Sequence, residues 1–142
     1  MPANTTPIFT KIGDVQWING ITTANTSTDL TTGTSYLAFT ADATNGGYVQ
    51  KVRFRAVNGT GNNNIATVAR VWINNGSTTG TAANNVLFDE ISLAATTGSA
   101  TSALAVYELP LNVALPAGYK IYITLGTTVA AGYSATVVGG KY

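Results

Sequence analysis

The chain of 142 residues contains no Cys and no His. Without Cys it cannot form disulfides, use a thiol nucleophile or build the usual zinc cages. Without His it lacks the commonest metal ligand and the side chain best suited to moving protons at neutral pH. These are the residue types on which most enzyme classes depend. We therefore expect a protein that is not an enzyme and that uses no metal and no cofactor.

Charge is also scarce. Lys and Arg number 7 and Asp and Glu number 6, which gives 9% charged residues and a formal net charge of +1. So weak an overall field predicts neither a nucleic-acid partner nor a membrane partner, and any electrostatic contact must be local. No apolar run approaches the roughly 18 residues of a membrane-spanning helix, and we expect no classical signal peptide.

Thr, Asn and Gly are abundant, whereas long polar side chains are few. Thr is branched at Cβ and favours strands, while Asn and Gly tolerate the positive φ angles of tight turns. This composition predicts strands and turns with little or no helix. Alternating hydrophobicity predicts strands at Thr34–Ala41, Tyr48–Val57, Ile65–Asn74, Asn84–Ala94, Leu104–Val113, Ala117–Gly126 and Tyr133–Val138, with a further short strand near Ile8–Trp17.

Seven or eight short strands separated by turn signals predict an all-β fold, an antiparallel β-sandwich of jelly-roll-like type. Asp89 and Glu90 interrupt the alternation of one strand, which indicates a bulge or an edge, and Pro110 indicates an edge or a break. The Asn45-Gly46-Gly47 sequence predicts a hairpin between the strands on either side. We expect residues 14–142 to form a single β-sandwich domain and residues 1–13 to form an extended N-terminal arm.

The strand around KVRFRAV, residues 51–57, has one charged face and one apolar face. The charged face carries Lys51, Arg53 and Arg55, and the predicted inner face carries Tyr48, Val52, Phe54 and Ala56. The simplest interpretation is the solvated side of a strand, where charges also discourage aggregation. The alternative is a docking surface for an acidic partner protein, because this chain has no other local concentration of cations.

Two further functions, glycoside hydrolysis and sugar binding, can be considered from individual residues. Asp89 or Glu90 could meet Glu108 across strands at the separation of about 5 to 9.5 Å that a glycosidase needs, but such carboxylates are more often solvated or ion-paired. Aromatic residues could form a sugar-binding platform, but Tyr119, Tyr122 and Trp72 lie on strands where packing explains them better.

The C-terminal third, VALPAGYKIYITLG (113–126) followed by GYSATVVGGKY (132–142), resembles the closing strands of small β-sandwich virion proteins of tailed bacteriophages, of capsid decoration (cement) or head-fibre type. The resemblance implies a structural protein at the capsid surface of a virion. It implies binding to the major capsid protein or another virion protein, and a homo-oligomer such as a trimer. It also implies that the N-terminal arm, through Pro7, Ile8 and Phe9, contacts a neighbouring subunit by strand addition. The alternative function is a carbohydrate-binding module or a receptor-binding adhesin.

Overall fold

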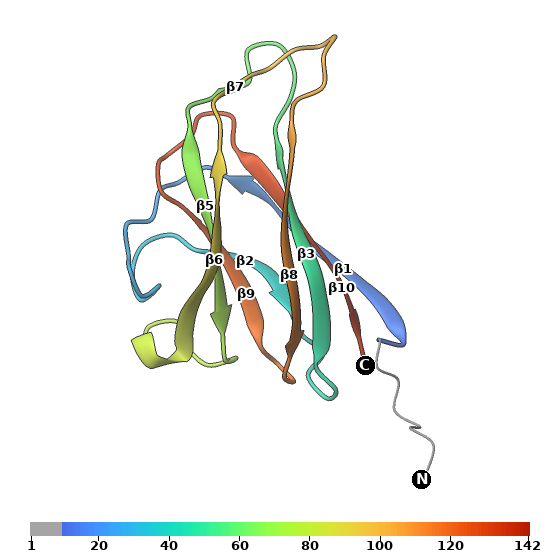
Figure 1. Ribbon diagram of the computed structural model, residues 1–142. Helices are drawn as coiled ribbons and strands as arrows, with labels where there is room; N and C mark the ends of the chain where they lie inside the picture. Colours follow the sequence, from blue (N-terminus) through green and yellow to red (C-terminus); the bar gives the residue numbers. More distant parts are fainter. Residues whose placement is uncertain (1–9) are drawn as a thin grey trace.

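The computed structural model describes residues 10–142, which form an antiparallel β-sandwich (Figure 1). Sheet A consists, in spatial order, of β1 (Ile12–Ile21), β10 (Tyr133–Lys141), β3 (Gly47–Ala56) and β8 (Val106–Leu115). Sheet B consists of β2 (Tyr36–Thr40), β9 (Lys120–Leu125), β5 (Thr67–Asn74) and β6 (Asn85–Leu93). The short strands β4 (Asn63–Asn64) and β7 (Thr96–Thr97) pair with each other, and one 3-10 turn, η1 (Ala82–Asn84), precedes β6.

The long strands pair in a nested order. β5 pairs with β6, which follows it in the chain, and this pair is enclosed in sequence by β3 with β8, then by β2 with β9, and finally by β1 with β10. Such nesting is that of a long hairpin rolled into two sheets, the eight-stranded jelly roll. The predicted all-β, antiparallel, jelly-roll-like fold is confirmed.

The core lies between the two sheets and is filled by every second side chain of each strand. Completely buried side chains from both sheets meet there, including Val52, Phe54 and Val137 from sheet A and Val71, Ile121 and Ile123 from sheet B. Burying one such side chain stabilises the fold by roughly 1.5–3 kcal/mol relative to leaving it exposed. The apolar face predicted for β3 is therefore the core face over its second half.

A β-bulge at Gln50 corrects the prediction for the first half of β3. Val49 and Lys51 lie opposite consecutive residues of β10, so Gln50 between them has no partner there. Val49 is completely buried, and Tyr48 lies on the outer side, where its hydroxyl donates to Oδ1 of Asn112 at 3.1 Å. The prediction that Tyr48 faces the core was wrong, because one inserted residue moves the preceding side chains to the opposite face.

The turn at Asn45 and Gly46 reverses the chain as predicted, but it does not form a hairpin. It connects β2 of sheet B to β3 of sheet A, so the two strands lie in different layers. Gly46 has a φ of 74°, and a Cβ at this position would collide with the carbonyl oxygen of Leu115. Only glycine fits such a position without strain. Turn chemistry therefore predicted the reversal, whereas the partner of each strand is chosen by distant core residues.

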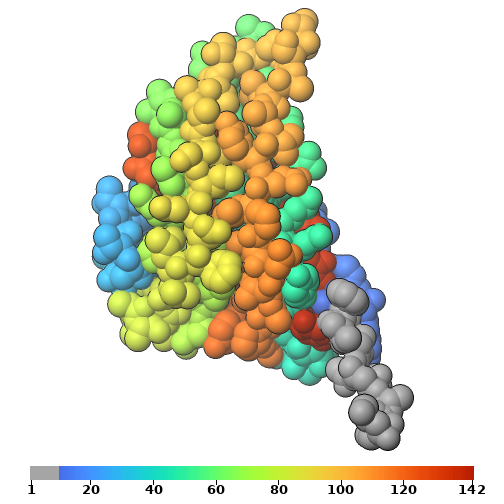
Figure 2. All heavy atoms as spheres, in the orientation of Figure 1, coloured from blue at the N-terminus to red at the C-terminus, as the bar shows by residue number. Residues whose placement is uncertain are grey.

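The strands β6 and β8 are neighbouring edges on one side of the sandwich, and Figure 2 shows them as one continuous surface. The edge positions predicted from Asp89 and Glu90 and from Pro110 are confirmed. The predicted bulge is present as well, because Phe88 has no partner between Leu87 and Asp89 on the β5 ladder.

The described chain approaches β1 along the end of β10. The N–H of Lys11 donates to the carbonyl of Lys141 at 3.1 Å, and β1 begins at Ile12. Pro7, Ile8 and Phe9 of the predicted arm lie outside the described residues. Within residues 10–142, no helix has the length and apolar character needed to cross a membrane.

Candidate partner-binding surface

The outer face of sheet A carries the three cations of β3. They point away from the core because the buried Val52 and Phe54 occupy the intervening positions. Both neighbouring strands extend this face with residues directly opposite Lys51, Arg53 and Arg55. These are Val138, Thr136 and Ser134 on β10 and Pro110, Glu108 and Val106 on β8.

Glu108 partly neutralises the cations. Its Oε1 lies 3.1 Å from Nζ of Lys51 and 3.9 Å from Nε of Arg53. All three side chains are about one-third to one-half exposed, so each ion pair contributes only about 0–1 kcal/mol to stability. Arg55 has no ion-pair partner among residues 10–142. Three cations therefore face one carboxylate, and the surface keeps a net positive charge.

Trp17 lies on the same outer face and was not identified from the sequence as a surface residue. It is 64% exposed. It lies opposite Thr136 of β10, which in turn lies opposite Arg53, so two strand spacings of about 5 Å each separate Trp17 from Arg53. The alternation of residues in β1 could have revealed its exposure, because Gln16 and Ile18 on either side of it are half-buried and lie on the other face.

We call Trp17, Lys51, Arg53, Arg55 and Glu108 the basic face. Trp and Arg are the side chains that most often dominate the free energy of protein–protein contacts. A sheet presents them on a broad surface, and a depression of about 290 Å³ lies at the end of the face near Tyr48 and Gln50. The chemistry of this face favours contact with an acidic macromolecular surface.

The carboxylates considered for catalysis are engaged in separate interactions. Glu90 pairs with Arg70 on sheet B at 3.4 Å, and Glu108 pairs with Lys51 on sheet A at 3.1 Å. Oδ1 of Asp89 accepts the N–H of Glu90 at 2.8 Å. In the part of the chain that the structure describes, no group of three or more His, Cys, Asp or Glu side chains could hold a metal ion.

Trp72 lies on the outer side of sheet B, yet it is only 2% exposed. Its indole N–H donates to Oγ1 of Thr124 at 3.0 Å. Residues 26–28, from the connection between β1 and β2, lie over it and share a cavity with it. The packing interpretation of Trp72 is confirmed, but its cover is a loop and not the second sheet. Tyr119 packs against the core, as predicted.

Fold and surface together define an eight-stranded jelly-roll protein with a broad, positively charged face. No protein-family model matches the chain, and no curated protein sequence matches it. Among solved structures, the chain is similar to one from "Structure of infectious bursal disease virus Gx strain", with a TM-score of 0.33 and 14% sequence identity. The match covers 98% of this chain and 35% of that chain.

Proposed function

We propose that the protein is a non-enzymatic structural subunit of a tailed-bacteriophage virion, which decorates or cements the capsid surface as a homo-oligomer. The observation that carries this proposal is the basic face, with its exposed Trp17 and with Arg55, which has no ion-pair partner among residues 10–142. Its partner is an acidic surface of the major capsid protein or of another virion protein. The resemblance of residues 113–142 to phage decoration proteins supports the same function.

The position of the basic face within the sheet favours binding without rearrangement. β3 and β10 are the two central strands of sheet A, and each is hydrogen-bonded to a neighbour on both sides. The backbone of such strands is held in place by ladder hydrogen bonds on both sides before the partner arrives. A preorganised surface loses less conformational entropy on association than a mobile one.

Single contacts from this face are weak, which is why the proposal includes an oligomer. An exposed ion pair contributes about 0–1 kcal/mol, and burying an aromatic side chain adds a few kcal/mol at most. An oligomer that engages several capsid sites combines these contributions through a high effective concentration. The N-terminal arm, through Pro7, Ile8 and Phe9, adds a further contact by pairing with a strand of a neighbouring subunit.

Binding to particles assembled without this protein tests the proposal. Wild-type protein is expected to saturate the particles at a fixed ratio in cosedimentation, with weaker binding at high salt because ions screen the basic face. The Arg55→Glu variant is expected to bind at least about ten-fold more weakly, because like charges at an interface repel. Lys120→Glu makes the same charge change on β9 of sheet B and is the matched control.

The possible outcomes test the proposed function and the proposed contact surface separately. Wild-type protein that never associates with the particles contradicts the proposed function. If the particles bind Arg55→Glu as tightly as wild type with unchanged salt dependence, the basic face is not the contact surface. Equal losses for Arg55→Glu and Lys120→Glu would show that net charge matters and the face does not.

A further inference from the structure

A cavity of about 290 Å³ lies over the outer side of sheet B, on the other sheet from the basic face. Its lining includes Thr26, Thr28, Arg70, Trp72, Leu87 and Gly126. The two Thr residues come from the connection between β1 and β2, and the others come from β5, β6 and the end of β9. The volume is at the lower limit of the roughly 300–1,000 Å³ of typical ligand pockets, which suits a ligand with one ring.

The loop that forms one wall is held in place by a buried asparagine. Nδ2 of Asn25 donates to the carbonyls of Thr32 and Thr34 at 3.0 and 2.9 Å, and its Oδ1 accepts the N–H of Ser27 at 2.8 Å. The backbone N–H of Asn25 donates to the carbonyl of Leu125 at 2.8 Å, which ties the loop to β9. A wall ordered in this way costs little further entropy when a ligand binds.

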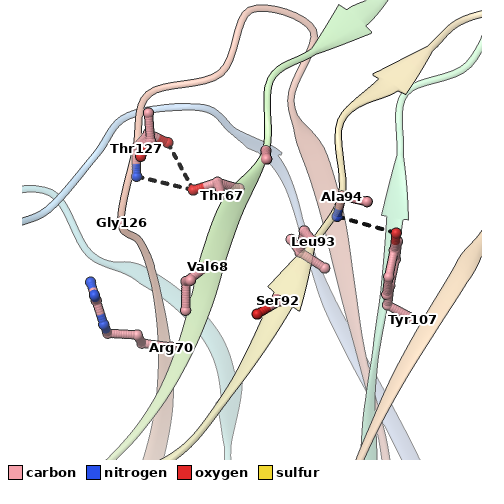
Figure 3. Close-up of a pocket in the computed structure, with 10 residues that line it drawn as sticks. Thr67, Val68, Arg70, Ser92, Leu93, Ala94, Tyr107, Gly126 and Thr127 are labelled. Atoms are coloured by element: carbon pink, nitrogen blue, oxygen red, sulfur yellow. Dashed lines mark hydrogen bonds between the residues drawn. The ribbon is translucent and has the colours of Figure 1, made fainter.

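Arg70 presents free donors beside this cavity. Its Nε lies 3.4 Å from Oε2 of Glu90, which occupies one side of the guanidinium group. Its two terminal nitrogens lie 3.5 and 3.6 Å from where a Cβ of Gly126 would be, and they make no hydrogen bond within residues 10–142. Figure 3 shows the side chain extending from β5, away from Ser92 and toward the segment that holds Gly126. The side chain is 30% exposed, so a ligand can reach it.

The rest of the lining combines free hydroxyls with an apolar surface. The hydroxyls of Thr26 and Thr28 make no hydrogen bond within the described residues, whereas the hydroxyl of Ser27 donates to Asp29 at 2.9 Å. Leu87 is 42% exposed and forms an apolar part of the wall. Trp72 lines the floor of the cavity, and its indole N–H is already satisfied by Thr124.

We propose that this cavity binds an acidic saccharide, that is, a sugar ring carrying a carboxylate. The carboxylate accepts two N–H groups from the terminal nitrogens of Arg70, in the paired geometry that a guanidinium group favours. The ring hydroxyls bond to Thr26 and Thr28, and the C–H groups of the ring pack on Leu87. A neutral sugar leaves the terminal nitrogens of Arg70 without a partner, and an inorganic anion leaves the hydroxyls and the apolar wall unused. Binding at this cavity on sheet B is independent of the proposed contact between sheet A and a capsid.

NMR titration of the 14.6 kDa protein with glucuronic acid and with N-acetylneuraminic acid tests the proposal. At least one of the two is expected to produce saturable shifts at the indole N–H of Trp72 and the amide of Gly126, with a dissociation constant in the millimolar range. The other Trp residue of the chain, Trp17, lies on sheet A. Its indole N–H serves as an internal reference that should not shift. Glucose is expected to bind about ten-fold more weakly, because a hydrogen bond to a charged group contributes about 1.5–3 kcal/mol.

Two sets of variants locate the site. Arg70→Gln is expected to weaken binding by about ten-fold or more, while Arg55→Gln makes the same change on the basic face and should leave binding unchanged. The double variant Thr26→Ala/Thr28→Ala keeps Arg70 and Glu90 in place and should weaken sugar binding several-fold. It serves as an independent test if Arg70→Gln does not fold.

Three results would overturn the proposal. The first is the absence of shifts at Trp72 and Gly126 with both acidic sugars in the folded wild-type protein. The second is equal affinity for glucose and glucuronic acid, which would show that Arg70 recognises no carboxylate. The third is binding of inorganic phosphate as tight as that of either acidic sugar, which would identify a simple anion site.

Discussion

Gln16 of β1 and Thr40 of β2 join the edges of the two sheets by a pair of hydrogen bonds. Oε1 of Gln16 accepts the N–H of Thr40 at 2.9 Å, and Nε2 donates to the carbonyl of Thr40 at 2.9 Å. The side-chain amide thus takes the place of a neighbouring strand residue at the open edge of β2. A side chain, and not a β-ladder, connects sheet A to sheet B at this position.

Replacing Gln16 with Ala should destabilise the fold. The change removes both hydrogen bonds and leaves partly buried backbone groups of Thr40 without partners, which costs roughly 1–3 kcal/mol. Urea unfolding measures this difference. Gln50→Ala is the matched control, because Gln50 is exposed and should change the unfolding free energy by less than about 0.5 kcal/mol. Equal stability of the two variants would contradict a structural role for Gln16.

Tyr36 should ionise at an unusually low pH for a tyrosine. Burial raises the pKa of Tyr36, but the N–H groups of Thr23 and Thr22 donate to its phenolic oxygen and outweigh burial, which lowers its pKa from 10.0 to about 8. Ultraviolet absorbance should therefore show one phenolate forming near pH 8, and Tyr36→Phe should abolish it. A low-pH phenolate that persists in Tyr36→Phe would assign it to another residue.

The low pKa of Tyr36 should also make the folded protein more stable as the pH rises. Because the pKa of Tyr36 is lower in the folded state, ionisation favours folding. The contribution is complete above the unfolded pKa of about 10 and disappears as the pH falls through about 8. The unfolding free energy of wild type relative to Tyr36→Phe should therefore rise between about pH 8 and pH 10, which unfolding curves across this range can measure.

Asn25 should be essential to the β1–β2 connection. It is 3% exposed, and its side-chain amide makes three hydrogen bonds within the loop. Asn25→Ala leaves these buried groups unpaired and should cost at least about 2 kcal/mol in urea unfolding. Asn75→Ala, at an exposed asparagine in a similar Asn-X-Ser/Thr sequence, is the control and should cost less than about 1 kcal/mol. Amide exchange at residues 26–28 should increase only in Asn25→Ala.

Glu108→Gln separates stability from binding. The variant removes the partner of Lys51 and Arg53, but exposed ion pairs contribute little, so the unfolding free energy should change by less than about 1 kcal/mol. If the basic face binds an acidic capsid surface, the variant should bind particles more tightly than wild type at low salt, with a steeper salt dependence. Weaker binding by Glu108→Gln would indicate that Glu108 itself contacts the partner.

Local patterns predicted most strands and most of their faces. In β3, the alternation of Phe54 with Arg53 and Arg55 predicted core and surface correctly, because successive side chains of a strand point to opposite sides. The alternation did not predict the bulge at Gln50. The bulge depends on the partner strand, where Gly139 packs so closely on the backbone of Tyr48 that a Cβ would collide with it.

The sites depended on contacts that no local pattern contains. Lys51, Arg53 and Arg55 were predicted as a group from a single strand, but Trp17 joins them only because β1 and β3 both pair with β10. The cavity beside Arg70 was not predicted at all. It exists because the β1–β2 connection folds over sheet B, held there by hydrogen bonds between residues far apart in sequence.

The sequence by itself determined that this protein is a charge-poor all-β sandwich whose third long strand carries cations on one side. Composition and period-2 alternation act residue by residue, so they can be recognised without knowing the partners of a strand. Only the tertiary structure decided which strands share a sheet, that Trp17 lies in the same row as Arg53, and that Arg70 borders a cavity. Those features come from packing between segments distant in the chain, where the geometry of the whole core selects one pairing.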